Sequence, residues 1–401
     1  MLTLDDARAL LASRVAALPA REVELADGLG CRLTSAPAAD TDLPPADLAA
    51  MDGYAVRADD LASRDPLPVA FVAAAGTSPP ALAAGSSARI FTGAVVPAGA
   101  DAVVPQEDAD VLPDGLVRLG RVPRGSNIRR QGEVFAAGTA LATAGDPLTP
   151  ARIAVLAAGG AVRVRVVPRP RVAVLVTGAE LAGAGDRLRA GQVRDSNGPM
   201  LEALAAEAGL AAVAVERVPD DLPALRARLA AAAERADLVV SSGGVSVGDF
   251  DFVPRAVADL GGEIVLHKVA IQPGKPVLVA RLGSAWIAGL PGNPVSVLVG
   301  WRMFARPLAE ALAGDATALA EPPVRATLAG PASNRGERTQ LRPARFERMG
   351  DGPAVRVLDW RGSHDILAAA PADALALLPP GARLATGDPV DVFPLPWRST
   401  W

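Results

Sequence analysis

The clearest pattern along the chain is an alternation of short apolar runs with longer amphipathic segments between about residues 170 and 313. The runs Val172–Thr177, Ala212–Glu216 and Leu238–Ser241 are typical of strands buried on both faces of a sheet. Further strands are predicted near Ile264–His267, Val277–Ala280 and Trp286–Ala288, and helices over Met200–Ala208, Leu222–Ala236 and from near Pro294 to about Ala313. This alternation predicts a mostly parallel, doubly wound α/β sheet, in which ligands bind beyond the carboxyl ends of the strands.

Two other parts of the chain have the pattern of small β-domains. Between about Glu22 and Pro150, short strand-like runs are bounded by Pro, Gly and Asp. These runs are Leu67–Ala74, Ala88–Phe91, Ala102–Pro105 and Gly115–Leu119. The same texture returns after the linker-like Glu321-Pro322-Pro323, where residues from Val324 to Phe393 predict a separate small β-barrel or sandwich.

The N-terminus predicts a helix and no targeting segment. Thr3 can cap a helix with Asp6 at the capping-box position, followed by one apolar face of Leu4, Ala7, Leu10 and Leu11. No basic stretch precedes an apolar core, and no apolar run approaches the ~20 residues of a membrane-spanning helix. We therefore expect a cytoplasmic protein without a membrane partner.

Composition and charge narrow the class of protein. The 401 residues predict roughly two to four domains, and a net charge of −4 suits a small-molecule enzyme better than a nucleic-acid binder. The single cysteine, Cys31, is predicted to be a buried small hydrophobe. His267 and His364 form no zinc pattern, so acid–base chemistry would have to come from carboxylates.

The loop Ser241–Asp251 follows the third predicted strand and is the strongest candidate for chemistry. Its glycines allow backbone N–H groups to converge on an anion, and its serine hydroxyls add donors for a phosphate. Asp249 and Asp251 offer the hard oxygen ligands that Mg²⁺ prefers. The alternative is an ordinary Gly-rich turn with solvated acids.

Further loops converge on the same sheet edge. Glu180 follows the first strand, and the pair Asp220-Asp221 follows the second, where capping the next helix is the structural alternative for one of the two. Pro273–Pro276 presents Lys275 in a rigid turn, and Leu290–Pro294 leads into a helix N-terminus, which favours an anion. Together these loops predict a phosphorylated ligand held with a divalent cation.

Two loops in the β-rich part carry candidate residues that their spacing alone does not assign. Asp52 lies in Met51–Ala55 and Thr92 in Phe91–Ala94. Asp52 could equally satisfy turn backbone, and Thr92 could be a residue of high strand propensity.

Together these segments closely resemble the MoeA-type molybdopterin molybdenumtransferases, a family that includes the E domain of gephyrin. The matching segments are Met51–Ala55, Phe91–Ala94, Gly125–Glu133, Thr177–Leu181, Asp195–Asn197, Ser241–Asp251, Pro273–Pro276 and Leu290–Pro294. They occur in the family's order over roughly residues 40 to 300, and SSGGVSVGD, PGKP and LPGNP are the most specific of them.

The resemblance implies a multidomain α/β plus β fold with four domains. A MogA-like, doubly wound molybdopterin-binding α/β domain would comprise residues 1–19 and 170–320. A discontinuous β-rich linker domain would comprise residues 20–40 and 136–169, a second β-rich domain residues 41–135, and a C-terminal β-barrel residues 321–401. The subunits would pair as homodimers, and because Asp52 and Thr92 lie in a different domain from Asp251, we expect the cleft to form across the dimer interface.

The resemblance also implies an activity and its residues. Molybdate is inserted into the dithiolene of adenylated molybdopterin, and Mg²⁺-dependent hydrolysis releases AMP and molybdenum cofactor. The positions matched to catalysis are Asp52, Thr92, Glu180, Asp220 and Asp251, of which the last three are assigned to Mg²⁺. The positions matched to substrate binding are Ser242, Gly243, Gly244, Ser246, Lys268, Lys275, Pro291, Asn293, Pro294, Arg338 and Ser363. Implied partners are a MogA-type adenylyltransferase and molybdoenzyme apoproteins.

Three positions depart from the family pattern. Val134 replaces a common acidic residue, Gln272 a common lysine, and Leu367 or Ala368 a serine. These changes bear on the molybdate pocket and the C-terminal domain. Two explanations are open, a changed oxyanion preference, such as for tungstate, and compensation by Arg338, Arg342 and Ser363. Two rival functions remain open, which are adenylation of molybdopterin and a non-catalytic role as carrier or scaffold, although the retained acids favour catalysis.

Overall fold

The computed structural model describes residues 1–63, 65–210, 212–245, 252–349 and 352–397. The chain forms two compact units. Unit 1 comprises Met1–Arg21, Gly30–Arg32 and Val167–Trp401, and unit 2 comprises Glu22–Leu29 and Leu33–Val166. This division is coarser than the four predicted domains, whose boundaries stay a prediction. In the described ranges, no helix has the length and apolar character needed to cross a membrane.

The centre of unit 1 is a six-stranded sheet with the order β15-β12-β16-β20-β19-β17. Its strands are β12 (Val172–Thr177), β15 (Ala212–Val218), β16 (Leu238–Ser242), β17 (Glu263–His267), β19 (Leu278–Leu282) and β20 (Ala285–Leu290). Strands β15, β12, β16 and β20 are parallel, whereas β19 is antiparallel to both of its neighbours. Because the chain passes from β12 outward to β15 and then back to β16, the strand order reverses at the ends of β12 and β16, where such folds bind ligands.

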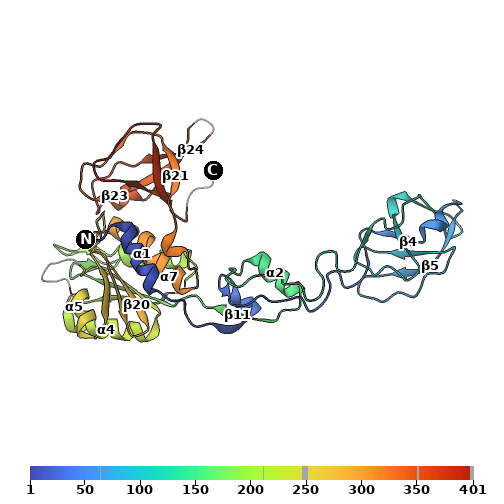
Figure 1. Ribbon diagram of the computed structural model, residues 1–401, viewed down its shortest axis with the longest axis horizontal. Helices are drawn as coiled ribbons and strands as arrows, with labels where there is room; N and C mark the ends of the chain where they lie inside the picture. The colour runs from blue at the N-terminus through green and yellow to red at the C-terminus, as the bar shows by residue number, and fades with distance from the viewer. Residues whose placement is uncertain (64, 211, 246–251, 350–351, 398–401) are drawn as a thin grey trace. The chain divides into compact units, whose positions relative to one another are not determined.

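Helices cover both faces of this sheet, which confirms the predicted doubly wound arrangement (Figure 1). One layer contains α1 (Leu4–Arg14), α3 (Asn197–Glu207), α6 (Pro294–Gly300), the π-helix η4 (Trp301–Ala305) and α7 (Arg306–Leu312). The other contains α4 (Leu222–Arg235) and α5 (Val253–Asp259). Alternate residues of β12 face the two layers, with Val174 toward the first and Leu175 toward the second. Helix α5 was not predicted, since seven residues carry too little periodicity.

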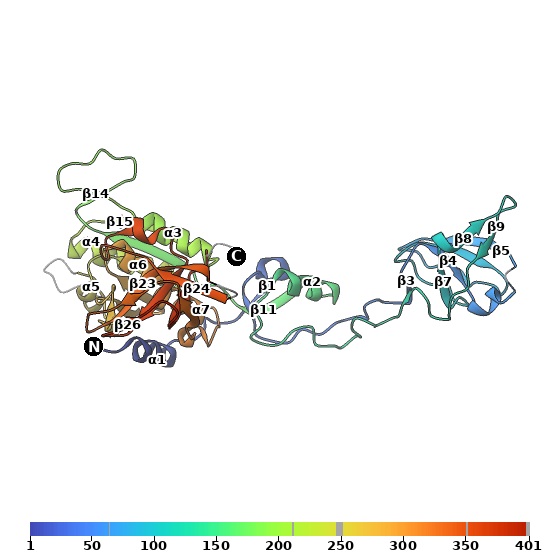
Figure 2. The ribbon, with the colours of Figure 1, turned by 90° about the horizontal axis from the view of Figure 1, so that it is seen from above.

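Local capping follows the sequence closely. The Thr3 hydroxyl accepts a hydrogen bond from the Asp6 amide at 3.1 Å and begins α1, as predicted. Asp221 accepts from the Ala224 amide at 2.8 Å and begins α4, so it is the member of the Asp220-Asp221 pair that caps. Cys31 is buried, as expected. Before α3 in the chain, the loop between β13 (Leu181–Ala182) and β14 (Val193–Arg194) projects from this part of unit 1 (Figure 2).

The C-terminal region of unit 1 is a closed five-stranded barrel. Its strands are β21 (Val324–Leu328), β23 (Thr339–Met349), β24 (Gly352–Val357), β25 (Ala374–Leu378) and β27 (Pro389–Pro394). The pairing of β23 with β25 closes the ring, so the barrel alternative is confirmed over the sandwich. A short strand of the α/β part, β18 (Ile271–Gln272), joins the barrel by parallel pairing with β23 at Thr339 and Gln340.

Unit 2 is β-rich, as predicted. Its six-stranded sheet has the order β7-β4-β6-β5-β9-β8. The strands are β4 (Gly53–Val56), β5 (Leu67–Ala73), β6 (Ser87–Ile90), β7 (Ala102–Pro105), β8 (Ala109–Val111) and β9 (Leu116–Leu119). A three-stranded sheet of order β1-β11-β2 is formed by β1 (Arg21–Glu24), β11 (Arg163–Val167) and β2 (Arg32–Leu33). The unit also contains the unpredicted helix α2 (Pro150–Ala158), which Thr149 caps and Gly159 ends.

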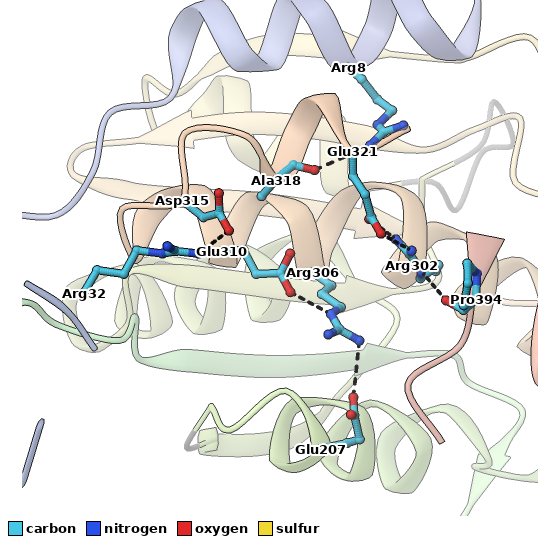
Figure 3. Close-up of polar contacts among 10 residues, drawn as sticks. All are labelled: Arg8, Arg32, Glu207, Arg302, Arg306, Glu310, Asp315, Ala318, Glu321 and Pro394. Atoms are coloured by element: carbon cyan, nitrogen blue, oxygen red, sulfur yellow. Dashed lines mark hydrogen bonds and ion pairs between the residues drawn. The ribbon is translucent and has the colours of Figure 1, made fainter. Parts of the chain in front are cut away.

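A buried arginine connects the α/β part to the barrel. The π-helix carries Arg302, whose side chain is 6% exposed and whose Nη1 and Nη2 each donate to the Glu321 carboxylate at 2.9 Å (Figure 3). Its Nε donates to the Pro394 carbonyl at 2.9 Å. Arg8 and Arg302 both lie 5.5 Å from the centre of the Phe393 ring. Burial lowers the pKa of the Arg8 guanidinium, and the charge of Glu321 opposes that shift.

We expect Glu321→Gln to lower the free energy of unfolding by about 1–3 kcal/mol, because the buried Arg302 guanidinium loses its charged acceptor. Urea unfolding followed by tryptophan fluorescence measures this change. Glu347→Gln is the matched control, since its pair with Arg356 is 34% and 48% exposed and should contribute about 0–1 kcal/mol. Equal losses in the two variants would contradict the role assigned to the buried Arg302 guanidinium, since Glu321 itself is 43% exposed.

Candidate functional site

Unit 1 contains a pocket of about 270 Å³ where the α/β part meets the barrel. Its walls come from the segments 272–276 and 291–296 of the α/β part and from barrel residues near 338 and 360–363. The predicted substrate-binding residues that line it are Lys275, Pro291, Asn293, Arg338 and Ser363. The structure therefore brings together five positions from four separate segments of the sequence.

Lys275 is presented by a constrained turn. The Gln272–Pro273 peptide bond is cis, and Gly274 has a φ of +100°, a conformation that favours glycine. The Val269 amide donates to the Lys275 carbonyl at 3.0 Å, and the Val277 amide donates to the Gly274 carbonyl at 3.1 Å. Lys268 belongs to the same turn region but does not line the pocket.

Ser363 and Asn293 join the barrel to the start of α6. The Asn293 side-chain nitrogen donates to the Ser363 hydroxyl at 2.9 Å, and the Val295 amide donates to the Ser363 carbonyl at 3.0 Å. The first turn of α6 was predicted to favour an anion. One of its amides, that of Val295, is already paired with Ser363. Arg338 donates through Nη1 to the Ile271 carbonyl at 3.0 Å, which uses one of the five N–H groups of its guanidinium.

The described part of the Gly-rich loop follows β16 and requires glycine. Gly243 has a φ of +93°, and a Cβ there would lie 2.5 Å from the Thr177 carbonyl oxygen. The Gly243 amide donates to the Leu290 carbonyl at 3.0 Å, which places the loop beside the end of β20. Ser242 is buried. The predicted positions Ser246, Asp249 and Asp251 lie outside the described residues.

The predicted acids follow neighbouring strand ends. Thr177 of β12 pairs with Val218 of β15, so Glu180 and Asp220 come shortly after two strands that end at the same level. Glu180 is exposed and Asp220 is half-buried. Within the described ranges, no group of three or more His, Cys, Asp or Glu side chains is arranged to hold a metal ion. The predicted Mg²⁺ site includes Asp251 and stays a prediction.

Unit 2 brings Asp52 and Thr92 into direct contact. The Thr92 amide and hydroxyl both donate to Asp52 Oδ1, at 2.7 and 2.8 Å. The amide bond is the larger cause of a lowered pKa of the Asp52 carboxyl, followed by the hydroxyl bond, with Arg89 adding a smaller effect. Gly53 follows directly, and a Cβ there would lie 1.9 Å from the Val104 carbonyl oxygen. The loop geometry therefore holds Asp52 in its charged form.

The positions that depart from the family pattern lie in different surroundings. Val134 and Leu367 are 65% and 82% exposed, and neither lines the pocket. Gln272 does line it, with its Oε1 3.5 Å from the Gln340 Nε2. Of these positions, Gln272 therefore has the most direct bearing on a ligand in this pocket.

Trp360 is a pocket residue that the sequence reasoning missed. The Arg342 guanidinium lies 5.2 Å from the centre of its ring, and burial lowers the pKa of that arginine. A tryptophan in a chain with 3% aromatic residues was the available signal. It was not used, because the loop after β24 carries no strand or helix pattern.

A larger cavity, of about 550 Å³, lies at the Arg302–Glu321 junction and contains none of the predicted site residues. Its charged side chains are already paired. Besides the Arg302–Glu321 pair, Arg306 donates to Glu310 at 2.8 Å, and Asp315 pairs with Arg32. We assign the functional site to the smaller pocket, because its lysine and arginine can still receive a ligand.

The fold and the pocket define a multidomain α/β protein with a basic site where its α/β part meets its barrel. Three family models match the chain in order. The MoeA N-terminal region (domain I and II) matches residues 2–160, the probable molybdopterin binding domain residues 173–311, and the MoeA C-terminal region (domain IV) residues 325–395.

Individual relatives agree with the family models. Molybdopterin molybdenumtransferase 2 of Mycobacterium tuberculosis is 40% identical over 318 residues, which covers 77% of this chain and 78% of that protein. The molybdopterin molybdenumtransferase of Staphylococcus aureus is 31% identical and covers 98% of this chain and 95% of its own length. The crystal structure of the molybdopterin biosynthesis MoeA protein from Pyrococcus horikosii matches with a TM-score of 0.78 and 29% identity over 100% of both chains. The chain belongs to the molybdopterin molybdenumtransferase family and is a transferase.

Thr92→Val should raise the pKa of Asp52 and still leave it below the usual value, because the larger contribution from the Thr92 amide remains. Since the folded-state pKa is lowered, the stabilisation from this carboxylate is present above its unfolded pKa and is lost as pH falls through the folded pKa. An NMR titration of the Asp52 carboxyl carbon follows the shift. Thr77→Val, which removes a hydroxyl that donates to the Ala74 carbonyl, should leave the Asp52 pKa unchanged. An unchanged pKa in Thr92→Val would rule out the hydroxyl contribution.

Proposed function

We propose that this chain inserts molybdate into adenylated molybdopterin and releases AMP in a Mg²⁺-dependent hydrolysis. The observation that supports this proposal most directly is the 270 Å³ pocket, in which Lys275, Asn293, Arg338 and Ser363 come together from the α/β part and the barrel. The names of the relatives, molybdopterin molybdenumtransferase, give the reaction class.

The pocket residues suit an oxyanion. Molybdate and the phosphates of the adenylated substrate bring several negative charges together, and cations with N–H donors lower the cost of that repulsion. Lys275 supplies a mobile charge from a rigid turn, and Arg338 supplies a planar fork with remaining N–H donors. The Ser363 hydroxyl accepts from Asn293, so its own proton is available to an anion.

Hard carboxylate oxygens suit Mg²⁺, and Glu180, Asp220 and Asp251 would hold the ion. The bound ion would supply charge neutralisation at the phosphates. In the hydrolysis, water adds to one phosphorus of the substrate's phosphoanhydride, the bond from that phosphorus to the bridging oxygen breaks, and AMP leaves. The hydrogen bonds from Thr92 lower the pKa of Asp52 and favour its charged form further, so it suits orientation of water or of the metal better than proton donation.

Other properties of the proposal come from the resemblance. We propose that the chain acts as a homodimer in the cytoplasm, receives its substrate from a MogA-type adenylyltransferase and passes the product to molybdoenzyme apoproteins. Light scattering of the purified chain tests the dimer, for which the expected mass is twice 40.7 kDa. A monomeric mass at working concentrations would contradict this part.

The direct test incubates the purified chain with adenylated molybdopterin, Mg²⁺ and either molybdate or tungstate, and follows AMP and pterin-bound metal. AMP release that depends on the oxyanion, with metal left on the pterin, is the expected result. Tight binding without AMP release would favour a carrier instead. Formation of adenylated molybdopterin from ATP and molybdopterin would favour an adenylyltransferase.

Lys275→Met should raise KM for adenylated molybdopterin by about tenfold to a hundredfold, because one charged hydrogen bond to the ligand is lost. Lys275→Arg should retain more of the affinity, since it keeps the charge. Arg325→Met, at an exposed barrel pair with Asp391, is the control and should keep the wild-type KM. A KM in Lys275→Met equal to that of the control would remove Lys275 from the binding site.

A further inference from the structure

Asn197 is buried beside the candidate site, and neither the predicted site residues nor the proposed mechanism includes it. It is the first residue of α3 and is 6% exposed. The usual capping task at this helix start is done by its neighbour, because Asp195 Oδ1 accepts from the Gly198 amide at 2.9 Å. The Asn197 side chain is therefore free to bond to other elements.

The Asn197 amide nitrogen bonds to the last residue of β16, where the Gly-rich loop begins, and to the loop that follows β20. Its Nδ2 donates to the Ser242 hydroxyl at 2.9 Å and to the Gly292 carbonyl at 2.7 Å. A carbonyl oxygen can only accept, so the NH₂ group must face Gly292 and the orientation of the amide is fixed. Both of its N–H groups are used, one on each loop.

The loop after β20 lines the pocket, and the end of β16 lies beside it. Ser242 and Leu290 are paired at the ends of adjacent parallel strands, and Gly292 lies between the pocket residues Pro291 and Asn293. A single side chain from α3 thus joins the Gly-rich loop to the loop that forms one pocket wall. Because Ser242 Oγ accepts from Asn197, its own proton is left to donate to a ligand.

One polar atom of the Asn197 side chain has no partner among the described residues. Six buried side-chain nitrogen or oxygen atoms have no hydrogen-bond partner in the described ranges, and they include Asn197 Oδ1 and Ser241 Oγ. Two more belong to Gln340 and Arg342, which contact the pocket residues Gln272 and Trp360. Buried polar atoms in native proteins are nearly always paired, so Asn197 Oδ1 is left to accept a hydrogen bond from a water molecule or a ligand.

We propose that Asn197 is a positioning residue for the phosphorylated ligand, holding the Ser242–Gly244 and Pro291–Asn293 loops in register through its two N–H groups. This inference rests on the proposed function. Asn197 acts through Ser242 and Gly292 and does not touch the reacting atoms. Its loss therefore weakens binding of the ligand in ground state and transition state alike, which raises KM and leaves kcat nearly unchanged.

The test compares Asn197→Asp, Asn197→Ala and a packing control in the same helix. Asn197→Asp keeps the shape of the side chain but turns a carboxylate oxygen toward the Gly292 carbonyl, so it removes both donors and adds repulsion. Leu204→Ala removes buried packing from α3 and leaves the loop contacts in place. Thermal unfolding of each full-length variant verifies the fold, calorimetry without oxyanion gives the Kd for adenylated molybdopterin, and AMP release gives KM and kcat.

In both Asn197 variants we expect KM and Kd to rise by about tenfold or more, with kcat within about threefold of wild type. Leu204→Ala should lower Tm and keep the wild-type KM and Kd. An unchanged Kd in Asn197→Asp, or an equal rise in Leu204→Ala, would overturn the positioning role. The two proposals can fail separately. If the wild-type chain binds adenylated molybdopterin, the Asn197 variants bind it more weakly, and no AMP is released, the proposed reaction is refuted and the positioning role of Asn197 stands.

Discussion

The parallel pairing of β12, β16 and β20 is the constraint on which the rest of unit 1 depends. Val176 pairs with Ser242, and Ser242 pairs with Leu290, so three loops start at one level of one sheet edge. The pairing is maintained by strand residues that are buried on both faces, against α3 and α6 on one side and α4 and α5 on the other. The polar loops can converge only because the apolar strands beneath them are fixed.

Convergence at one level also crowds the strand ends and restricts which residues fit there. A side chain at Gly243 would collide with the Thr177 carbonyl, and Gly289, one residue before the end of β20, lies against Val245. Backbone groups brought this close need partners, and Asn197 provides one at Gly292. The glycines at positions 243 and 289 and the buried amide of Asn197 are thus consequences of the same crowded sheet edge.

Much of the fold follows from the sequence, because its strongest patterns report burial. The runs Val172–Thr177 and Leu238–Ser241 predicted buried strands, and the parallel sheet followed from their alternation with helices. The pairing of β18 with β23 was not predictable, since a two-residue strand has no period and its partner is in another domain.

Lys275 and Asn293 were identified because their motifs are local. Trp360 was missed as a pocket residue, and Asn197 was noted only within the matching segment Asp195–Asn197, because the contacts of both depend on distant parts of the chain. Glu180, Asp220 and Asp251 as metal ligands stay a prediction.

The pairing of β18 with β23 has a consequence for how such proteins can be recombined. Gln272 belongs by sequence to the α/β part but pairs with Gln340 in a barrel sheet, and the turn that carries Lys275 follows it directly. A barrel exchanged between relatives at the Glu321–Pro323 linker would leave this strand behind and set it against a foreign neighbour. A working barrel graft therefore has to include two segments, the barrel itself and β18. The second of these lies within the α/β part, which the graft is meant to leave unchanged.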